Sequence, residues 1–95
     1  MRPMDVNFFA TLRQVAGQKT VAMSLIDGST VRALIDAVVT RFPGMRDELL
    51  TETGDLRPHV HVFINGQDAP YLEHGLDTRI SGNDKLDLFP AVGGG

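Results

Sequence analysis

The sequence predicts an α+β fold in which a mixed sheet of four to five strands packs on one main helix. Short runs of alternating apolar and polar residues recur along the chain, and this period-two alternation is typical of strands that bury one face. A single stretch, residues 31–42, carries apolar residues at helical spacing. One helix covers only one side of a sheet, so we expect the other side to stay open.

The first 25 residues predict two strands that form a hairpin. Residues 4–12 alternate, which places Val6 and Ala10 on the inner face. Residues 16–18 contain a glycine and are expected to form the turn, and residues 19–25 alternate again.

The helix is expected to begin after Thr30, a residue type that caps helix N-termini well. Its apolar stripe follows the spacing i, i+3, i+4, i+7, i+8, i+11 and consists of Val31, Leu34, Ile35, Val38, Val39 and Phe42. The helix should end near Phe42, because Pro43 disfavours helical geometry in the residue before it. Residues 45–50 are expected to add a short helical turn.

The second half of the chain predicts the remaining strands. Residues 59–65 alternate with Val60, Val62 and Ile64 inward, and the dipeptide Asn65-Gly66 is a strong hairpin signal. Residues 67–80 are expected to hold a small edge strand and a tight turn, and residues 85–89 a final strand that Pro90 ends. This element order suits a β-grasp fold, in which the first and last strands lie side by side in the middle of the sheet.

Composition excludes several classes of function. The 95 residues carry a net charge of −3 with scattered Lys and Arg, which argues against nucleic-acid binding. No apolar stretch approaches the length of a membrane span, so we expect no membrane association and a cytoplasmic protein. The absence of cysteine excludes disulfides, thiolate metal sites and a cysteine nucleophile. We expect one domain at residues 1–90 and a flexible glycine tail at residues 91–95.

The expected chemistry lies in this tail, which reads Ala-Val-Gly-Gly-Gly. Gly93, Gly94 and Gly95 have no side chains to pack, so they are not there for core stability. With Val92 they form a segment slim enough to enter a narrow channel, and the carboxylate of Gly95 sits on an unhindered carbon. Such a carboxylate becomes a useful electrophile once ATP converts it to an acyl-adenylate. An inert, frayed end is the alternative interpretation.

Four segments together resemble a known family. FFATLRQVAG (residues 8–17), INGQD (64–68), GLDT (75–78) and FPAVGGG (89–95) resemble, in the same order, the MoaD/ThiS ubiquitin-like sulfur carriers. The resemblance covers nearly the whole chain, and the terminal di-glycine is its specific part. Gly93 stands where members often have Ala or Ser.

The resemblance implies a mechanism and its partners. An adenylating enzyme of the ubiquitin-activating type would use ATP and Mg to adenylate Gly95. A sulfur donor protein would convert the adenylate to a thiocarboxylate, which a sulfur-accepting synthase would consume. The chain would then be a co-substrate rather than an enzyme, with no catalytic residue and no bound cofactor of its own.

The branch of the family stays open. Residues 8–17 resemble the small subunit of molybdopterin synthase, whereas residues 56–68 are closer to the cysteine-biosynthesis carriers and the small archaeal modifiers. Two functions of other classes also remain: a modifier joined through Gly95 to target lysines, for which Lys19 and Lys85 are candidate acceptors within the chain, and a non-covalent interaction module.

Three aromatic residues predict a docking surface. Phe9, Phe63 and Phe89 each have the opposite parity from the core residues of their strands, so we expect their rings together on the open face, where a partner would bind. His59 and His61 lie two apart and would share one strand face, but no third ligand is in clear reach, and no metal site is predicted.

Overall fold

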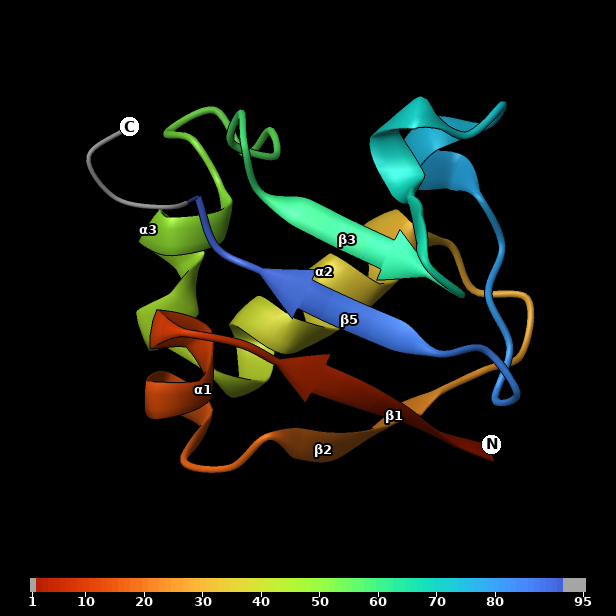
Figure 1. Cartoon of the computed structure of the whole chain (residues 1–95), viewed down its shortest axis with the longest axis horizontal. Coiled ribbons are helices and arrows are strands. Elements are labelled where there is room, and N and C mark those ends of the chain that lie inside the picture. Colours follow the sequence, from red (N-terminus) through yellow and green to blue (C-terminus); the bar gives the residue numbers. More distant parts are fainter. Residues whose placement is uncertain (1, 92–95) are drawn as a thin grey trace.

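In the computed structural model, which describes residues 2–91, a five-stranded sheet carries one long helix on one face (Figure 1). The strands are β1 (Arg2–Phe8), β2 (Thr20–Leu25), β3 (His61–Ile64), β4 (Gln67–Asp68) and β5 (Leu86–Phe89). The helices are α1 (Thr11–Ala16), α2 (Val31–Arg41) and α3 (Arg46–Leu49), with single 3₁₀ turns at η1 (Pro43–Met45), η2 (Ala69–Tyr71) and η3 (Gly75–Asp77).

The sheet has the order β2-β1-β5-β3-β4. Its two central strands, β1 and β5, are parallel, and β2 and β3 flank them in antiparallel pairing. The first and last strands therefore lie side by side in the middle of the sheet, which confirms the predicted β-grasp arrangement. The strand β4 follows β3 through a turn in which Asn65 and Gly66 both have positive φ, as the Asn-Gly dipeptide predicted.

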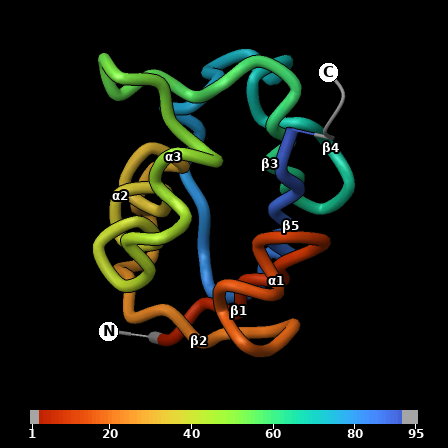
Figure 2. Tube along the Cα trace, turned by 90° about the vertical axis from the view of Figure 1, so that its left-hand side faces the viewer, coloured from red at the N-terminus to blue at the C-terminus, as the bar shows by residue number. Residues whose placement is uncertain are grey.

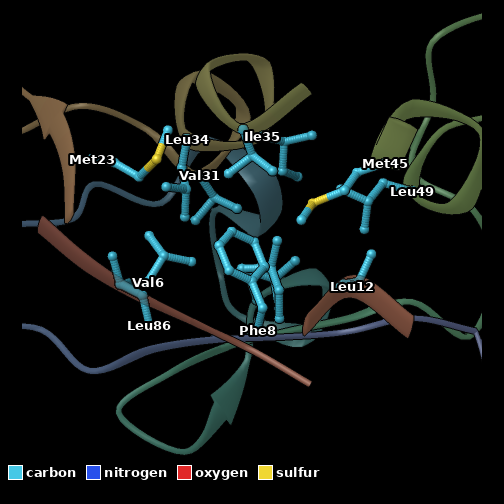
Figure 3. Packing of buried hydrophobic residues seen from close by; sticks show 14 of the residues in the cluster. Val6, Phe8, Leu12, Met23, Val31, Leu34, Ile35, Met45, Leu49 and Leu86 are labelled. Atoms are coloured by element: carbon cyan, nitrogen blue, oxygen red, sulfur yellow. The ribbon is translucent and has the colours of Figure 1, made fainter. Parts of the chain in front are cut away.

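The core lies between the sheet and α2, and Figure 2 shows these two layers from the side. Phe8 of β1 is fully buried and points toward α2, and its ring meets that of Phe42 edge-on at 5.8 Å (Figure 3). Four residues of α2 are buried in this core, as the spacing predicted: Val31, Leu34, Ile35 and Val38. Among the described residues, no helix has both the length and the apolar character needed to cross a membrane.

The boundaries of α2 are set by local chemistry. The Thr30 side chain accepts a hydrogen bond from the Ala33 backbone N–H at 3.1 Å, which confirms the predicted N-cap. The helix ends at Arg41, one residue before Phe42 and two before Pro43, as expected. The predicted helical turn after it is also present, as η1 followed by α3.

The prediction for residues 4–18 was wrong in part. The strand ends at Phe8 rather than Leu12, Ala10 is exposed with φ of 54° rather than inward, and α1 replaces the simple hairpin turn. Leu12 has the same parity as Val6 and Phe8 and is buried as they are. Its side chain, however, enters the core from α1 and not from a strand. Alternation did not distinguish a strand from a helix here, because position 12 would face inward in the expected strand and is also buried in α1.

Candidate functional site

The open face of the sheet carries an aromatic cluster, which we define as Phe9, Phe63 and Phe89. The rings of Phe9 and Phe89 stack with centroids 4.2 Å apart, and Phe63 meets Phe89 edge-on at 5.5 Å. All three rings are half-buried. The structure thus brings together the three residues that parity predicted, whereas their role in docking stays a prediction.

Strand register explains why the rings meet. Phe89 closes β5 and pairs with His61 of β3, and the next pair on the same face of these strands aligns Asp87 with Phe63. Phe9 directly follows β1, and its backbone N–H donates to the carbonyl of Leu88 at 3.2 Å. The cluster therefore depends on the central pairing of β1, β5 and β3.

The aromatic cluster borders an apolar groove of about 260 Å³, which we call the tail-exit groove. It is lined by Ala10, Thr11, His61, Phe63, Phe89, Pro90 and Ala91. Pro90 and Ala91 are the last residues that the structure describes, so the groove lies where the chain leads on from β5. The predicted tail residues Val92, Gly93, Gly94 and Gly95 lie outside the described residues.

His61, one of the polar residues in this groove, pairs with a carboxylate. The Nδ1 atom of His61 lies 2.7 Å from Oδ2 of Asp68, and the imidazole stacks on Phe63 with centroids 5.6 Å apart. The Asp68 side chain is only 15% exposed. The sequence interpretation missed Asp68, because nothing in residues 67–80 showed that β4 would align it with Phe63.

The expectation that His59 and His61 share a strand face was wrong. The strand β3 begins at His61, and His59 precedes it with φ of 69°, outside extended geometry. Within the described part of the chain, no three His, Asp or Glu side chains gather as metal ligands.

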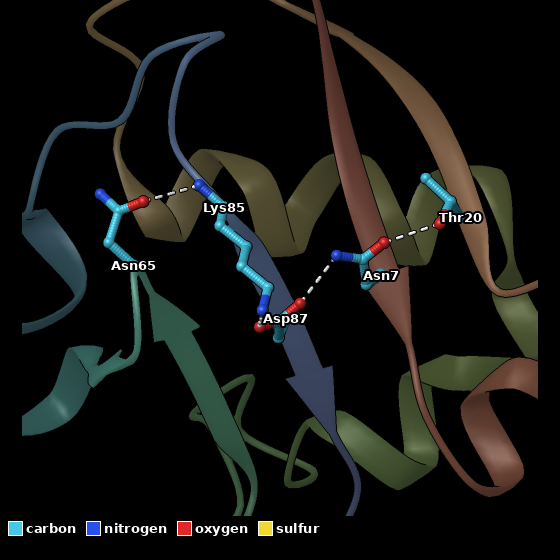
Figure 4. Close-up of polar contacts among 5 residues, drawn as sticks. All are labelled: Asn7, Thr20, Asn65, Lys85 and Asp87. Atoms are coloured by element: carbon cyan, nitrogen blue, oxygen red, sulfur yellow. Dashed lines mark hydrogen bonds and ion pairs between the residues drawn. The ribbon is translucent and has the colours of Figure 1, made fainter.

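A polar row crosses the open face beside the aromatic cluster. Asp87 is only 7% exposed, its Oδ1 accepts a hydrogen bond from the Asn7 amide at 2.8 Å, and its Oδ2 lies 3.8 Å from Lys85 Nζ (Figure 4). Thr20 donates to the Asn7 carbonyl oxygen at 2.7 Å. This row links β2, β1 and β5, and on β3 it meets Phe63, which pairs with Asp87.

Comparisons with known proteins identify the family. The model of the ThiS family matches residues 6–95 of this chain. The chain belongs to the ThiS family. The resemblance to ubiquitin-like sulfur carriers is thereby confirmed, and the match extends through the glycines that follow Ala91.

Two characterised relatives align along most of the chain. Small archaeal modifier protein 3 of Haloferax volcanii is 34% identical over 97% of this chain and 98% of its own length. The sulfur carrier protein CysO of Mycobacterium tuberculosis is 32% identical over 83% of both chains.

Solved structures give the same result. The crystal structure of SAMP1 from Haloferax volcanii superimposes with a TM-score of 0.83 at 33% identity, covering 98% of this chain and 99% of that one. A crystal structure of a BexX/CysO complex from Amycolatopsis orientalis contains a chain that superimposes with a TM-score of 0.76 at 31% identity, over 97% of this chain and 99% of that one. The family therefore includes both sulfur carriers and modifiers, and a similar chain is found in complex with another protein.

Proposed function

We propose that this chain is a sulfur carrier that works through the carboxylate of Gly95. The observation that carries the proposal is the glycine end, residues 93–95, which falls inside the family match and comes four residues after the end of the central strand β5 in the sequence. Because glycine has no side chain, the residues after Val92 offer the least obstruction both to entry into a narrow pocket and to attack on the carbonyl.

The proposed chemistry has two steps. An adenylating enzyme of the ubiquitin-activating type, using ATP and Mg, joins the Gly95 carboxylate to AMP and releases pyrophosphate. The outer sulfur of a persulfide on the sulfur donor protein then attacks the acyl carbon, and AMP leaves. A thiol cleaves the S–S bond that now joins the acyl group to the donor, which leaves a thiocarboxylate on Gly95. The carrier contributes the acyl group and binds no cofactor itself, and its expected place is the cytoplasm, where ATP is present.

The aromatic cluster would provide the docking surface for these partners. Its rings are half-exposed beside the groove from which the tail extends, so a partner that covers the rings also receives the tail. Apolar aromatic surface of this kind is typical of interaction sites. The sulfur acceptor would be a synthase of the molybdopterin type or an enzyme of the cysteine type. In the first case the chain would also be a non-catalytic small subunit.

A covalent modifier is the second candidate function. The similarity to small archaeal modifier protein 3 along nearly the whole chain favours it. The same adenylate of Gly95 would then react with a target lysine, and the product would be an isopeptide bond.

Intact-mass measurement separates these functions. The full chain is incubated with the cognate adenylating enzyme, ATP, Mg and a sulfur donor. A mass gain that equals one oxygen-to-sulfur exchange supports the carrier, whereas high-mass conjugates support the modifier. An unchanged mass with a verified Gly95 terminus contradicts both and leaves an interaction module.

A further inference from the structure

His61, which lines the tail-exit groove, has one ring nitrogen with no hydrogen-bond partner in the described part of the chain. Thr11 and His61 are the two groove residues with polar side chains. The Thr11 hydroxyl donates a hydrogen bond to Glu48 Oε1 at 2.5 Å, and Nδ1 of His61 forms a hydrogen bond with Asp68. No hydrogen bond of His61 Nε2 is found among residues 2–91.

Asp68 determines which nitrogen of His61 carries the proton. An ionised carboxylate only accepts hydrogen bonds, so the proton between the two groups belongs to Nδ1. A neutral imidazole carries one N–H, and its other nitrogen is then an acceptor. In the neutral imidazole, Nε2 of His61 is therefore a hydrogen-bond acceptor.

Two contacts fix this acceptor in place. The imidazole stacks on Phe63 with an interplanar angle of 18°, which sets the plane of the ring. The pairing of β3 with β4 holds Asp68 opposite Phe63. Within the described residues, Oδ1 of Asp68 is buried without a hydrogen-bond partner, and Oδ2 bonds to His61.

We propose that His61 is a recognition residue for the adenylating enzyme, the protein that receives the tail. Its Nε2 accepts a hydrogen bond from an N–H or O–H group of that enzyme, and Asp68 is its positioning residue. This inference rests on the proposed function. Pro90 and Ala91 line the same groove as His61, so a protein that encloses the residues after Ala91 also lies against the imidazole of His61. A surface that covers it without a donor leaves a buried acceptor unpaired, which weakens binding.

The first measurement is the tautomer of His61, read from two-bond ¹H–¹⁵N correlation spectra of the labelled full chain at neutral pH. We expect Nδ1 protonated and Nε2 bare in the free protein. In Asp68→Ala, the proton should also populate Nε2, because the carboxylate that holds it on Nδ1 is gone. A wild-type spectrum with Nε2 protonated overturns the proposal.

The second measurement is the affinity for the purified adenylating enzyme by calorimetry. His61→Phe retains a ring to stack on Phe63 but has no nitrogen, and we expect binding roughly three- to tenfold weaker. The matched control is His59→Phe, which changes a neighbouring histidine outside the groove and should bind as the wild type does.

The outcomes separate this inference from the function on which it rests. His61→Phe binding as tightly as the wild type overturns the recognition role even when the wild type gains its sulfur. A wild type that gains no sulfur overturns the proposed function, while its His61 spectrum still reports on the tautomer. Should Asp68→Ala fail to fold, the wild-type spectrum and the pair of phenylalanine variants decide the matter.

Discussion

The ring of Phe89 contacts both Phe9 and Phe63 and stays half-exposed, whereas Phe8, the neighbour of Phe9 in sequence, is fully buried. Successive residues of a strand face opposite sides of the sheet, so one residue of the pair serves the core and the other the open face. Mutations at these positions should therefore separate stability from partner binding.

Phe89→Ala is expected to raise the KM of the adenylating enzyme for this chain about ten- to thirtyfold, the usual effect of truncating an aromatic hot spot. The free energy of unfolding should fall by only about 1–2 kcal/mol, since a half-exposed ring loses mainly its stacking contacts. Steady-state adenylation kinetics and urea unfolding check the two values.

Two controls accompany Phe89→Ala. Phe8→Ala leaves a cavity in the core and should lower the free energy of unfolding by about 3–5 kcal/mol. Tyr71→Ala removes a ring that is 86% exposed and lies outside the tail-exit groove, and its KM should not change. An unchanged KM for Phe89→Ala would contradict the docking role of the aromatic cluster.

Among the elements, α2 and β5 have different tasks. The helix α2 supplies one layer of the core, and its start is held by the Thr30 side chain. The strand β5 contributes Leu86 and Leu88 to the core and Phe89 to the open face, and it ends beside the tail-exit groove. The helix therefore stabilises the sheet from one side while the site is built on the other.

Thr30→Ala should lower the free energy of unfolding by about 1 kcal/mol, because the Ala33 N–H loses its capping acceptor. Thr30→Ser keeps the oxygen and should retain most of this stability. Urea unfolding of both variants measures the difference, and adenylation kinetics should be unaffected in either. Equal losses for Ala and Ser would mean that the capping hydrogen bond does not hold the start of α2.

For the molecule as a whole, stability and the proposed reaction belong to different parts of the chain. The buried core extends from Met4 to Leu88, with Ala91 as its last packed residue. The residues proposed to react follow Ala91. The core of the described residues thus ends, along the sequence, before the residues proposed to react.

Deletion of Gly94 and Gly95 is expected to abolish the mass gain of the sulfur-transfer assay. The free energy of unfolding should stay within about 0.5 kcal/mol of the wild type, since glycine has no side chain to pack. Urea unfolding and intact mass measure the two effects. Truncation after Lys85 is the contrasting control, because it removes β5 and its two fully buried leucines and should prevent folding. A loss of more than 1 kcal/mol on deletion of the two glycines would assign them a structural role instead.

Most elements could be predicted because their causes are local. The spacing of apolar residues in 31–42, the cap at Thr30 and the Asn65-Gly66 turn each act over a few residues, and the structure confirms all three. Parity likewise predicted the aromatic cluster, since strand geometry fixes the face of each side chain. The switch to α1 was missed because Leu12 keeps the strand's parity in either conformation.

By itself, the sequence determined the order of the main strands and the long helix, the faces of the three phenylalanines and the glycine end, because these follow from residue type and spacing. Only the tertiary structure decided that His61 pairs with Asp68 and that Asp87 is buried beside Asn7. The physical reason is that each of these pairs joins different strands, and a contact between strands depends on their register, which no single segment of the chain contains.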